Sequence, residues 1–451
     1  MKSPLWQVSK KGKSRWLFLG SKANLTANLG MFAIKKTKPI NYGARMAQNY
    51  KQLDDNELAE LFDLHALFLL NKPEGRRLSL TIVDFSKIVW QNRDLSDAQI
   101  IGCNFSGAKF VNCRFDRADL SQCNFQSADF RRASLRFAVL RGANLINADL
   151  SMADLTCADL RENHQVEMRS SNKLQIIRHE ARASSAVNAL FNGATMDNSR
   201  LDKMDLGGAN FKDSSLKGAS LEKTVLTNCD FTGANLAGAR LVEAQLGGAI
   251  FHEAILTGAE FGKVAVQGEK FRGAVLSLSA TEQEQASTLK SMAKAHELWW
   301  QTNGKSGKPA NFDDTDLRPM GNDFVQMRLT ALSAKNCIAT GLLFHDTQLQ
   351  GANFEGADLR GASFANADLR GANFKGARLV KCDFTAANLG PLPVSPASPK
   401  YADFSNSDLR YAKFDDANLL NALFHGADTS ETSFKNASIM APKNAPTAFV
   451  A

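Results

Sequence analysis

Residues 143–160 read ANLINADLSMADLTCADL, and a leucine returns at every fifth position of this stretch. An alanine stands two residues before each leucine, so the repeating unit is Ala-(Asp/Asn)-(Leu/Phe)-x-x. A period of five fits neither an α-helix, which repeats at 3.6 residues, nor a β-strand, which repeats at 2. It fits a chain that turns a corner every five residues, with the leucine and the alanine pointing inward and the other three residues pointing out.

Four such sides close a square coil of about 20 residues, and coils stack at the ~4.8 Å spacing of β-strands, which pairs their backbone groups. The small inward residue is needed because so narrow an interior cannot hold two large side chains per side. The pattern holds over three blocks that differ in phase, residues 78–162, 189–276 and 311–440. The sequence therefore predicts an all-β solenoid, a quadrilateral β-helix.

With these units the chain resembles the pentapeptide-repeat proteins, which are right-handed quadrilateral β-helices. The resemblance covers roughly residues 78–162, 189–276 and 342–440. It is specific for the fold and weak for function, because the repeated residues are structural. Known relatives include Qnr-type quinolone-resistance proteins, which bind DNA gyrase, and secreted effectors of intracellular bacteria.

Each change of phase marks a break in the stack, and the breaks divide the chain into segments. We expect a helix at 174–182, because this stretch has good helix formers and neither Pro nor Gly. A second, amphipathic helix is expected at 282–300. Four prolines in 390–400 cannot donate ladder hydrogen bonds, so this segment is predicted to be a loop. The predicted segments are 1–53, a basic disordered tail; 54–77, a helical cap; 78–162, the first block; 163–188, a helical insertion; 189–276, the second block; 277–310, a helical cap or linker; 311–440, the third block with its loop; and 441–451, a flexible tail.

Two short segments repeat a second pattern. Each has a histidine followed by apolar residues, then a glycine and a basic residue, and then the first coil of a block; the histidines are His65 and His296. Solenoids need caps, because a bare end exposes apolar side chains and unpaired backbone. We therefore predict a helical cap that is used twice, with a packed histidine in each.

Charge is distributed unevenly along the chain. The net charge is +8, but residues 1–53 hold eleven Lys and Arg and no acid, so the rest carries −3. The basic clusters of this tail and a predicted strip of outward arginines are candidate partner contacts, as is the proline loop. The candidates are Arg131, Arg136, Arg141, Arg161, Pro391, Pro393, Pro396, Lys10, Lys11, Lys13 and Trp16.

No motif in the sequence indicates catalysis, nucleotide binding or metal binding. No nucleophile elbow, P-loop, dinucleotide fingerprint or HExxH motif occurs. The seven cysteines include no CxxC pair, and five of them fall on the small inward position, where a cysteine acts as a small apolar residue. No apolar run reaches the ~18 residues of a membrane span. We therefore expect no enzyme activity, no cofactor, no metal and no small-molecule substrate.

Three hypotheses of function remain. The first is a scaffold for a protein partner in the cytoplasm. The second is a Qnr-like protector of a topoisomerase, and the third is an effector secreted into a host cell, with the tail as an export or membrane-targeting segment. A duplex as long as the stacked blocks would carry about 35 negative charges at one per ~1.7 Å, whereas the three blocks together carry about −4, so general DNA mimicry is poorly supported. The tail could bind an anionic membrane surface or nucleic acid.

Overall fold

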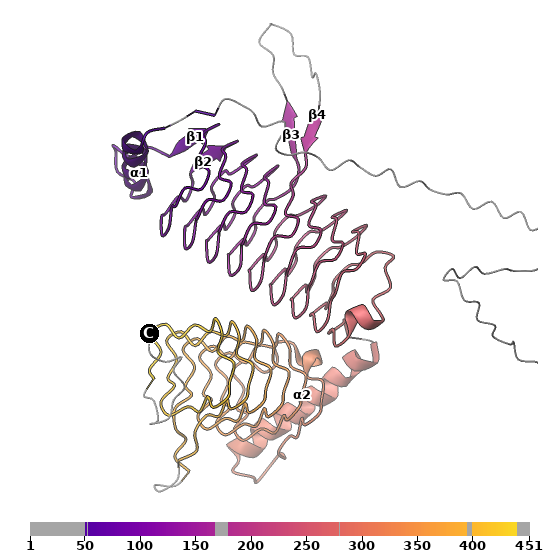
Figure 1. The fold of residues 1–451 in the computed structure, drawn as a ribbon. Coiled ribbons are helices and arrows are strands. Elements are labelled where there is room, and N and C mark those ends of the chain that lie inside the picture. Colours follow the sequence, from indigo (N-terminus) through magenta and orange to yellow (C-terminus); the bar gives the residue numbers. More distant parts are fainter. Residues whose placement is uncertain (1–49, 52, 167–178, 279, 395–398, 440–451) are drawn as a thin grey trace, which may run out of the picture. The chain divides into compact units, whose positions relative to one another are not determined.

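The computed structural model describes residues 50–439 apart from 52, 167–178, 279 and 395–398. All of them belong to one compact unit, Asn49–Ala451. Residues 1–49, which include most of the predicted basic tail, and the C-terminal segment lie outside the described residues. The elements are α1 (Asp55–Leu69), β1 (Ser79–Thr81), β2 (Gln99–Ile101), β3 (Asn163–Val166), β4 (His179–Arg182), η1 (Glu269–Phe271), α2 (Ala280–Gln301) and η2 (Arg318–Met320) (Figure 1).

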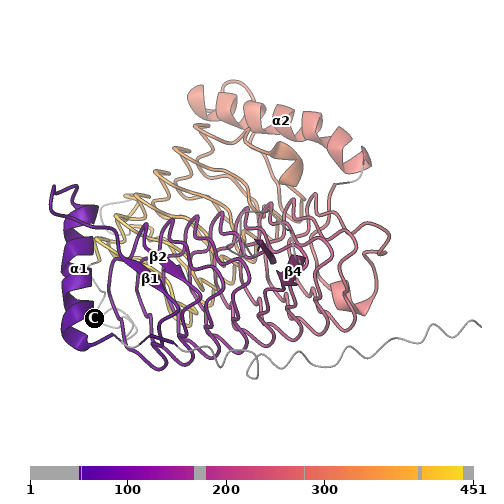
Figure 2. The same ribbon diagram turned by 90° about the horizontal axis from the view of Figure 1, so that it is seen from above.

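Most of the chain forms coils that are joined by single parallel backbone pairs. Residue Asn104 pairs with Asn124, and Asn124 with Asn144, so a coil takes 20 residues, or four five-residue units. Strands β1 and β2 pair in the same parallel register, with Leu80 opposite Ile100. The coils are visible edge-on in Figures 1 and 2. The predicted all-β solenoid is confirmed.

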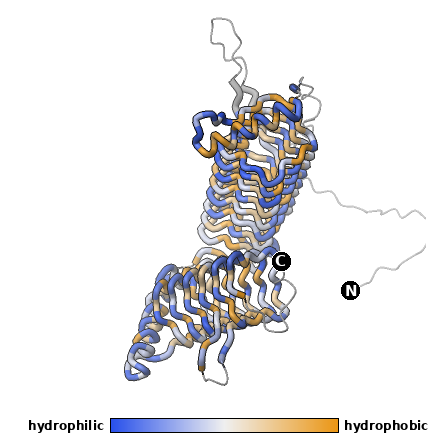
Figure 3. Tube along the Cα trace, turned by 90° about the vertical axis from the view of Figure 1, so that its left-hand side faces the viewer, coloured by the Kyte–Doolittle hydropathy of each residue, from blue (hydrophilic) through white to orange (hydrophobic). Residues whose placement is uncertain are grey.

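The inward positions are buried as the period predicts. In the unit around Leu150, both Leu150 and Ala148 have no exposed surface. Apolar and polar residues accordingly alternate in short runs along every coil (Figure 3). Equivalent phenylalanines stack from coil to coil: the ring centroids of Phe191 and Phe211 lie 4.9 Å apart, and those of Phe211 and Phe231 lie 4.8 Å apart. These distances equal the strand spacing, so backbone pairing and ring stacking support each other.

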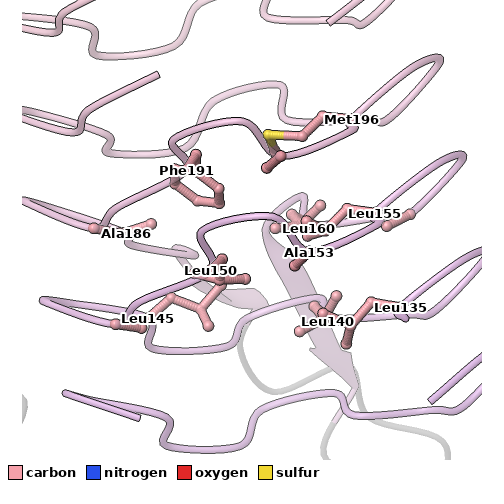
Figure 4. Packing of buried hydrophobic residues seen from close by; sticks show 14 of the residues in the cluster. Leu135, Leu140, Leu145, Leu150, Ala153, Leu155, Leu160, Ala186, Phe191 and Met196 are labelled. Atoms are coloured by element: carbon pink, nitrogen blue, oxygen red, sulfur yellow. The ribbon is translucent and has the colours of Figure 1, made fainter. Parts of the chain in front are cut away.

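The first two blocks form one continuous stack. Asn144 pairs with Ser185, and Asp159 with Arg200, so the ladder crosses the insertion without a break. In Figure 4, Phe191 lies over Leu150 and Met196 over Leu155, and a single core runs through both blocks. We call residues 78–276 solenoid 1.

The third block stacks separately. Its ladder begins with Asn311 paired to Ser333, and its core is a second cluster that includes residues of α2. We call residues 310–439 solenoid 2. The coil after residue 373 is ten residues longer than the regular coil of 20, because Asn373 pairs with Asp403, and 390–400 accounts for the excess.

The prediction of a helix in the first insertion is wrong where the structure describes it. Residues 179–182 are strand β4, which pairs antiparallel with β3, and Asn163 lies opposite Arg182. The two ends of the insertion must meet, since the coil that leaves at Leu160 and the coil that returns at Ser184 are neighbours in one ladder. An antiparallel strand pair brings the ends together, whereas a helix would carry the chain away from the corner.

The two segments of the predicted cap make matching hydrogen bonds. Leu78 N–H donates to His65 Nδ1 at 3.1 Å, and Ala310 N–H donates to His296 Nδ1 at 3.0 Å. The basic residue after each glycine donates to the helix carbonyl just before the histidine, Arg76 to Leu64 at 2.9 Å and Lys308 to Ala295 at 3.1 Å.

Each cap depends on its glycine and on a neutral histidine. A Cβ on Gly75 or Gly307 would collide with helix backbone, so the close approach requires glycine at both positions. Both histidines are buried, and burial lowers the pKa of each. Because Nδ1 accepts in both caps, each ring is neutral with its proton on Nε2, and in His296 this group donates to Thr330 O at 3.0 Å.

Candidate interaction surface

Six arginines in the described part of the coils bind the aspartate two residues before them, in their own unit. Arg131 Nη2 lies 2.7 Å from Asp129 Oδ2, and its Nε lies 2.9 Å from Asp129 Oδ1. This two-pronged geometry matches the guanidinium fork to the carboxylate, and the hydrogen bond from Arg131 lowers the pKa of Asp129. The same Asp-x-Arg pair recurs at Arg161, Arg318, Arg360, Arg370 and Arg410.

The predicted strip of basic residues does not exist as one strip. The ladder places Arg131, Arg136 and Arg141 on three different columns, which run through Asp129, Ser134 and Val139. Each of the three is also near a carboxylate; the most distant, Arg136, lies 3.7 Å from Asp154. The spacing of five that separates these arginines is one side of a coil, so it turns each onto a new face.

Arg141 and Arg161 do share a face, as their spacing of 20 predicts. Both bind Asp159, at 2.7 and 2.8 Å. Burial opposes ionisation of Asp159, but the two guanidinium groups outweigh it and hold the pKa of this carboxyl well below its usual range. Two guanidinium groups share this one carboxylate, and Arg200 lies 3.9 Å from it, so the cluster keeps a net positive charge that Asp159 offsets only in part.

The proline loop lies against the coils that precede it. Leu392 N–H donates to Lys400 O at 2.7 Å, and Lys400 N–H donates to Leu392 O at 2.9 Å, which closes the base of the loop. A Cβ on Gly371 would lie 2.9 Å from Leu392 Cβ, so glycine at this corner makes room for the loop. Pro391 is half-buried and Pro393 is exposed, whereas Pro396 lies outside the described residues. Lys10, Lys11, Lys13 and Trp16 also lie outside them.

The cysteines belong to the core, as predicted. None of the seven forms a disulfide, and six are buried. Cys229 Sγ donates to Leu206 O at 3.0 Å, and burial raises the pKa of Cys229 and of Cys337 to about 12. Among the described residues no three His, Cys, Asp or Glu side chains group as metal ligands would. No helix in this part of the chain is both long and apolar enough to span a bilayer.

A set of polar contacts joins the two solenoids, and the sequence did not predict it. Arg410 Nη1 lies 2.6 Å from Asp213 Oδ2, and Arg132 Nη2 lies 2.6 Å from Glu431 Oε2. Glu253 binds Arg378 through its carboxylate and Arg360 through its carbonyl oxygen. We call this set of contacts the seam; its members are Arg132, Gly193, Asp213, Glu253, Arg360, Arg378, Lys381, Arg410, Tyr411 and Glu431.

One sequence signal for the seam does exist. The second residue after each large inward residue has positive φ, and Gly or Asn commonly fills this corner. In one column of solenoid 2 the residues are Gly341 and Gly361, followed by Lys381 and Tyr411. Large side chains at consecutive corners, at a backbone conformation that suits glycine, indicate a contact.

A comparison with family models identifies the repeats. Eight copies of the model described as pentapeptide repeats match the chain over more than half of its length. The matched residues are 94–132, 123–162, 189–228, 229–264, 335–389 and 402–439. A comparison with curated proteins returns no significant match.

Several solved structures are similar. One is HetL from the cyanobacterium Nostoc sp. strain PCC 7120, a pentapeptide repeat protein involved in heterocyst differentiation regulation. Its sequence is 16% identical, the match covers 85% of this chain and 96% of HetL, and the TM-score is 0.27. Full-length QnrB1, a plasmid-mediated fluoroquinolone resistance protein, is 20% identical over 47% of this chain and 95% of that chain, with a TM-score of 0.24. A pentapeptide repeat protein from the thylakoid lumen of Arabidopsis thaliana is 28% identical, and the match covers 27% of this chain and 77% of that chain, with a TM-score of 0.16.

Proposed function

Because this chain belongs to the pentapeptide repeat family, we propose that it is a non-enzymatic scaffold that binds a protein partner. Its inward residues are committed to the core, so any recognition falls to the outward residues and to the segments that interrupt the coils. The Asp-x-Arg pairs leave the coil faces close to neutral. The interrupting segments are therefore the better candidates for the specific contact.

The structure of the loop at 390–400, which projects an exposed apolar side chain from a complete coil, supports this proposal. The ladder pairs Asn388, just before the loop, with Asn418, and Asp403, just after it, with Asn373, so the coil is complete without the loop residues. Beside the exposed Pro393, Val394 is 69% exposed, the largest value for a large apolar residue in the described part of the chain. Loops held on a rigid scaffold commonly carry recognition, and an exposed proline and valine fit an apolar contact on a partner.

Capture of a partner from native lysate tests the proposal. The full chain is compared with a variant that carries Pro393→Ser and Val394→Ser, and with a deletion of residues 390–399, which leaves the period of five intact. Val89→Ser is the matched control, because Val89 is 56% exposed on solenoid 1. We expect the captured protein to be lost with both loop variants and kept with the control. Identical capture by all four proteins would contradict the role of the loop.

The Qnr-like hypothesis is a narrower form of this proposal. The sequence supports it through interrupting segments that resemble the projecting loops of Qnr-type proteins. The paired arginines argue against a surface that imitates DNA, since Arg131, Arg161 and Arg370 each neutralise an outward aspartate. A supercoiling assay with DNA gyrase, a fluoroquinolone and the full chain separates the two. Protection of the gyrase would favour the narrower form, and no effect would leave only the general scaffold.

The basic segment at 1–53 adds a second proposal, which rests on its sequence alone. Its eleven positive charges and its tryptophans suit an anionic membrane surface, and nucleic acid would satisfy the same charges. The full chain should then bind anionic vesicles or DNA at low salt, and a chain that starts at Leu53 should not. We propose a cytoplasmic location, with secretion into a host cell as the alternative; fractionation of cells that produce the protein distinguishes them.

A further inference from the structure

The seam is built from one corner column of solenoid 1 and, in solenoid 2, from the corner column of Lys381, Tyr411 and Glu431 together with the neighbouring Arg360, Arg378 and Arg410. In solenoid 1 the column holds Arg132, Gly193, Asp213 and Glu253, each of which stands two residues after a large inward residue. The contacts run in opposite directions along the two solenoids. Arg132, the first seam residue of solenoid 1, meets Glu431, the last of solenoid 2, whereas Glu253, the last of solenoid 1, meets Arg360 and Arg378, the first of solenoid 2. The seam therefore has a defined register.

The side chain of Tyr411, which we call the knob, packs over Gly193 and fixes this register at the centre of the seam. Tyr411 has a φ of 62°, a conformation that costs a bulky residue free energy. A Cβ on Gly193 would lie 2.5 Å from Tyr411 Cε1 and 2.6 Å from Met152 Sδ, so only glycine leaves space for the ring. Lys381 Nζ closes the site from the side, 3.2 Å from Gly193 O and 5.9 Å from the centre of the Tyr411 ring.

The charges of the seam supply specificity more than strength. Asp213 is only 8% exposed, and its partner Arg410 also binds Asp408. Burial raises the pKa of Asp213 and lowers that of Lys381 to about 8, so docking removes water from both charged groups at a cost. Buried ion pairs of this kind gain little net free energy, although mismatched charges are strongly rejected. Each solenoid also has its own apolar core.

We propose that the seam is a reversible latch: the two solenoids dock in one register and separate without unfolding. The docked form covers the Asp213 and Glu253 corner of solenoid 1, and the separated form exposes it. A contact held by charges and one aromatic knob should weaken as salt screens the exposed pairs at its edge, Arg132 with Glu431 and Arg378 with Glu253.

Small-angle X-ray scattering of the full chain tests the latch. The radius of gyration is measured at 0.05 M and at 1 M salt for the wild type, for Gly193→Asn and for Gly238→Asn. Asn tolerates the positive φ of both glycines, but only at Gly193 does the new side chain enter the space of Tyr411. At Gly238, the nearest atom to a Cβ is a backbone nitrogen 4.0 Å away. We expect Gly193→Asn to have a larger radius at low salt, Gly238→Asn to match the wild type, and the wild type to expand at high salt.

If Gly193→Asn does not fold, Tyr411→Asn tests the same contact. This substitution removes the aromatic ring from the seam and also relieves the backbone strain of a bulky residue with a φ of 62°. Circular dichroism confirms that each variant keeps its β-structure. An unchanged radius in the seam variants would overturn the proposal. Equal expansion of Gly238→Asn would overturn it as well, because strain in the coil would then be the cause. A wild type whose radius does not respond to salt would show a fixed contact and would overturn reversibility.

Discussion

The small inward residues set the width of the coil. Ala148 and Ala357 have no exposed surface, and each faces the core of a coil whose corners are fixed by backbone hydrogen bonds. We expect Ala148→Leu and Ala357→Leu to lower the free energy of unfolding by about 1–3 kcal/mol, because the extra methylenes overpack a core that cannot widen. Chemical denaturation measures this change. Gln126→Leu, at an exposed position, is the control and should be near neutral; an equal loss in the control would contradict the inward and outward assignment.

Phe137 stands at a corner with a φ of 58°, and its side chain is 53% exposed. The conformation suits Asn, which occupies the corresponding corner at Asn147 with a φ of 55°. Phe137→Asn should therefore raise stability by about 1 kcal/mol, since the strain of a bulky residue in the left-handed region is removed. A thermal melt of the two proteins measures the gain. A lower melting temperature for the variant would mean that the exposed ring makes a stabilising contact.

The helical caps make the stability of the chain depend on pH. His65 and His296 each accept a backbone hydrogen bond at Nδ1, which a protonated ring cannot do, and burial lowers the pKa of both. The folded state therefore binds fewer protons than the unfolded state. The stability is fully present above the unfolded pKa of about 6.5 and is lost as the pH falls through the lower folded values. The melting temperature should drop between pH 7.5 and pH 5, and less steeply in His296→Asn. An equal slope in the variant would exclude His296 as the cause.

At the scale of elements, the period of five predicted the repeated coils and their buried positions, but it did not predict the structures that occur only once. Burial of Leu150 and Ala148 follows from their place in the unit, and the caps follow from a repeated motif. Strand β4 could not be predicted in this way, because helix propensity is a weak prior and the need for the insertion to close on itself decided the structure. The loop was predicted from its prolines, but the packing of its Leu392 against Gly371 was not. The seam joins residues up to 299 positions apart, such as Arg132 and Glu431, so the large corner residues Lys381 and Tyr411 indicate that a contact exists but not which residues it meets.

At the scale of the molecule, the described residues from 50 to 439 form two cores that share a polar contact. The ladder of solenoid 1 ends with Ile255 paired to Val275, and that of solenoid 2 starts again at Asn311. In a solenoid each coil depends on its neighbours in the stack, so cooperativity extends only as far as the ladder continues. The caps at α1 and α2 each close the first coils of one stack, which gives each solenoid its own protected end.

Residues 50–278 and residues 280–451 should therefore fold as separate fragments, and calorimetry of the full chain should resolve two transitions that match those of the fragments. Residues 50–166 are the control, since this cut leaves Leu145, Leu150 and Leu155 without the coil that covers them (Figure 4). That fragment should melt at a lower temperature or aggregate, because its last coils expose apolar side chains and unpaired backbone. Fragments that are unfolded alone, beside a single sharp transition of the full chain, would mean that the seam contributes to folding and is no latch. Two independent transitions together with a radius that grows with salt would make the chain two scaffolds that dock through Tyr411 and Gly193.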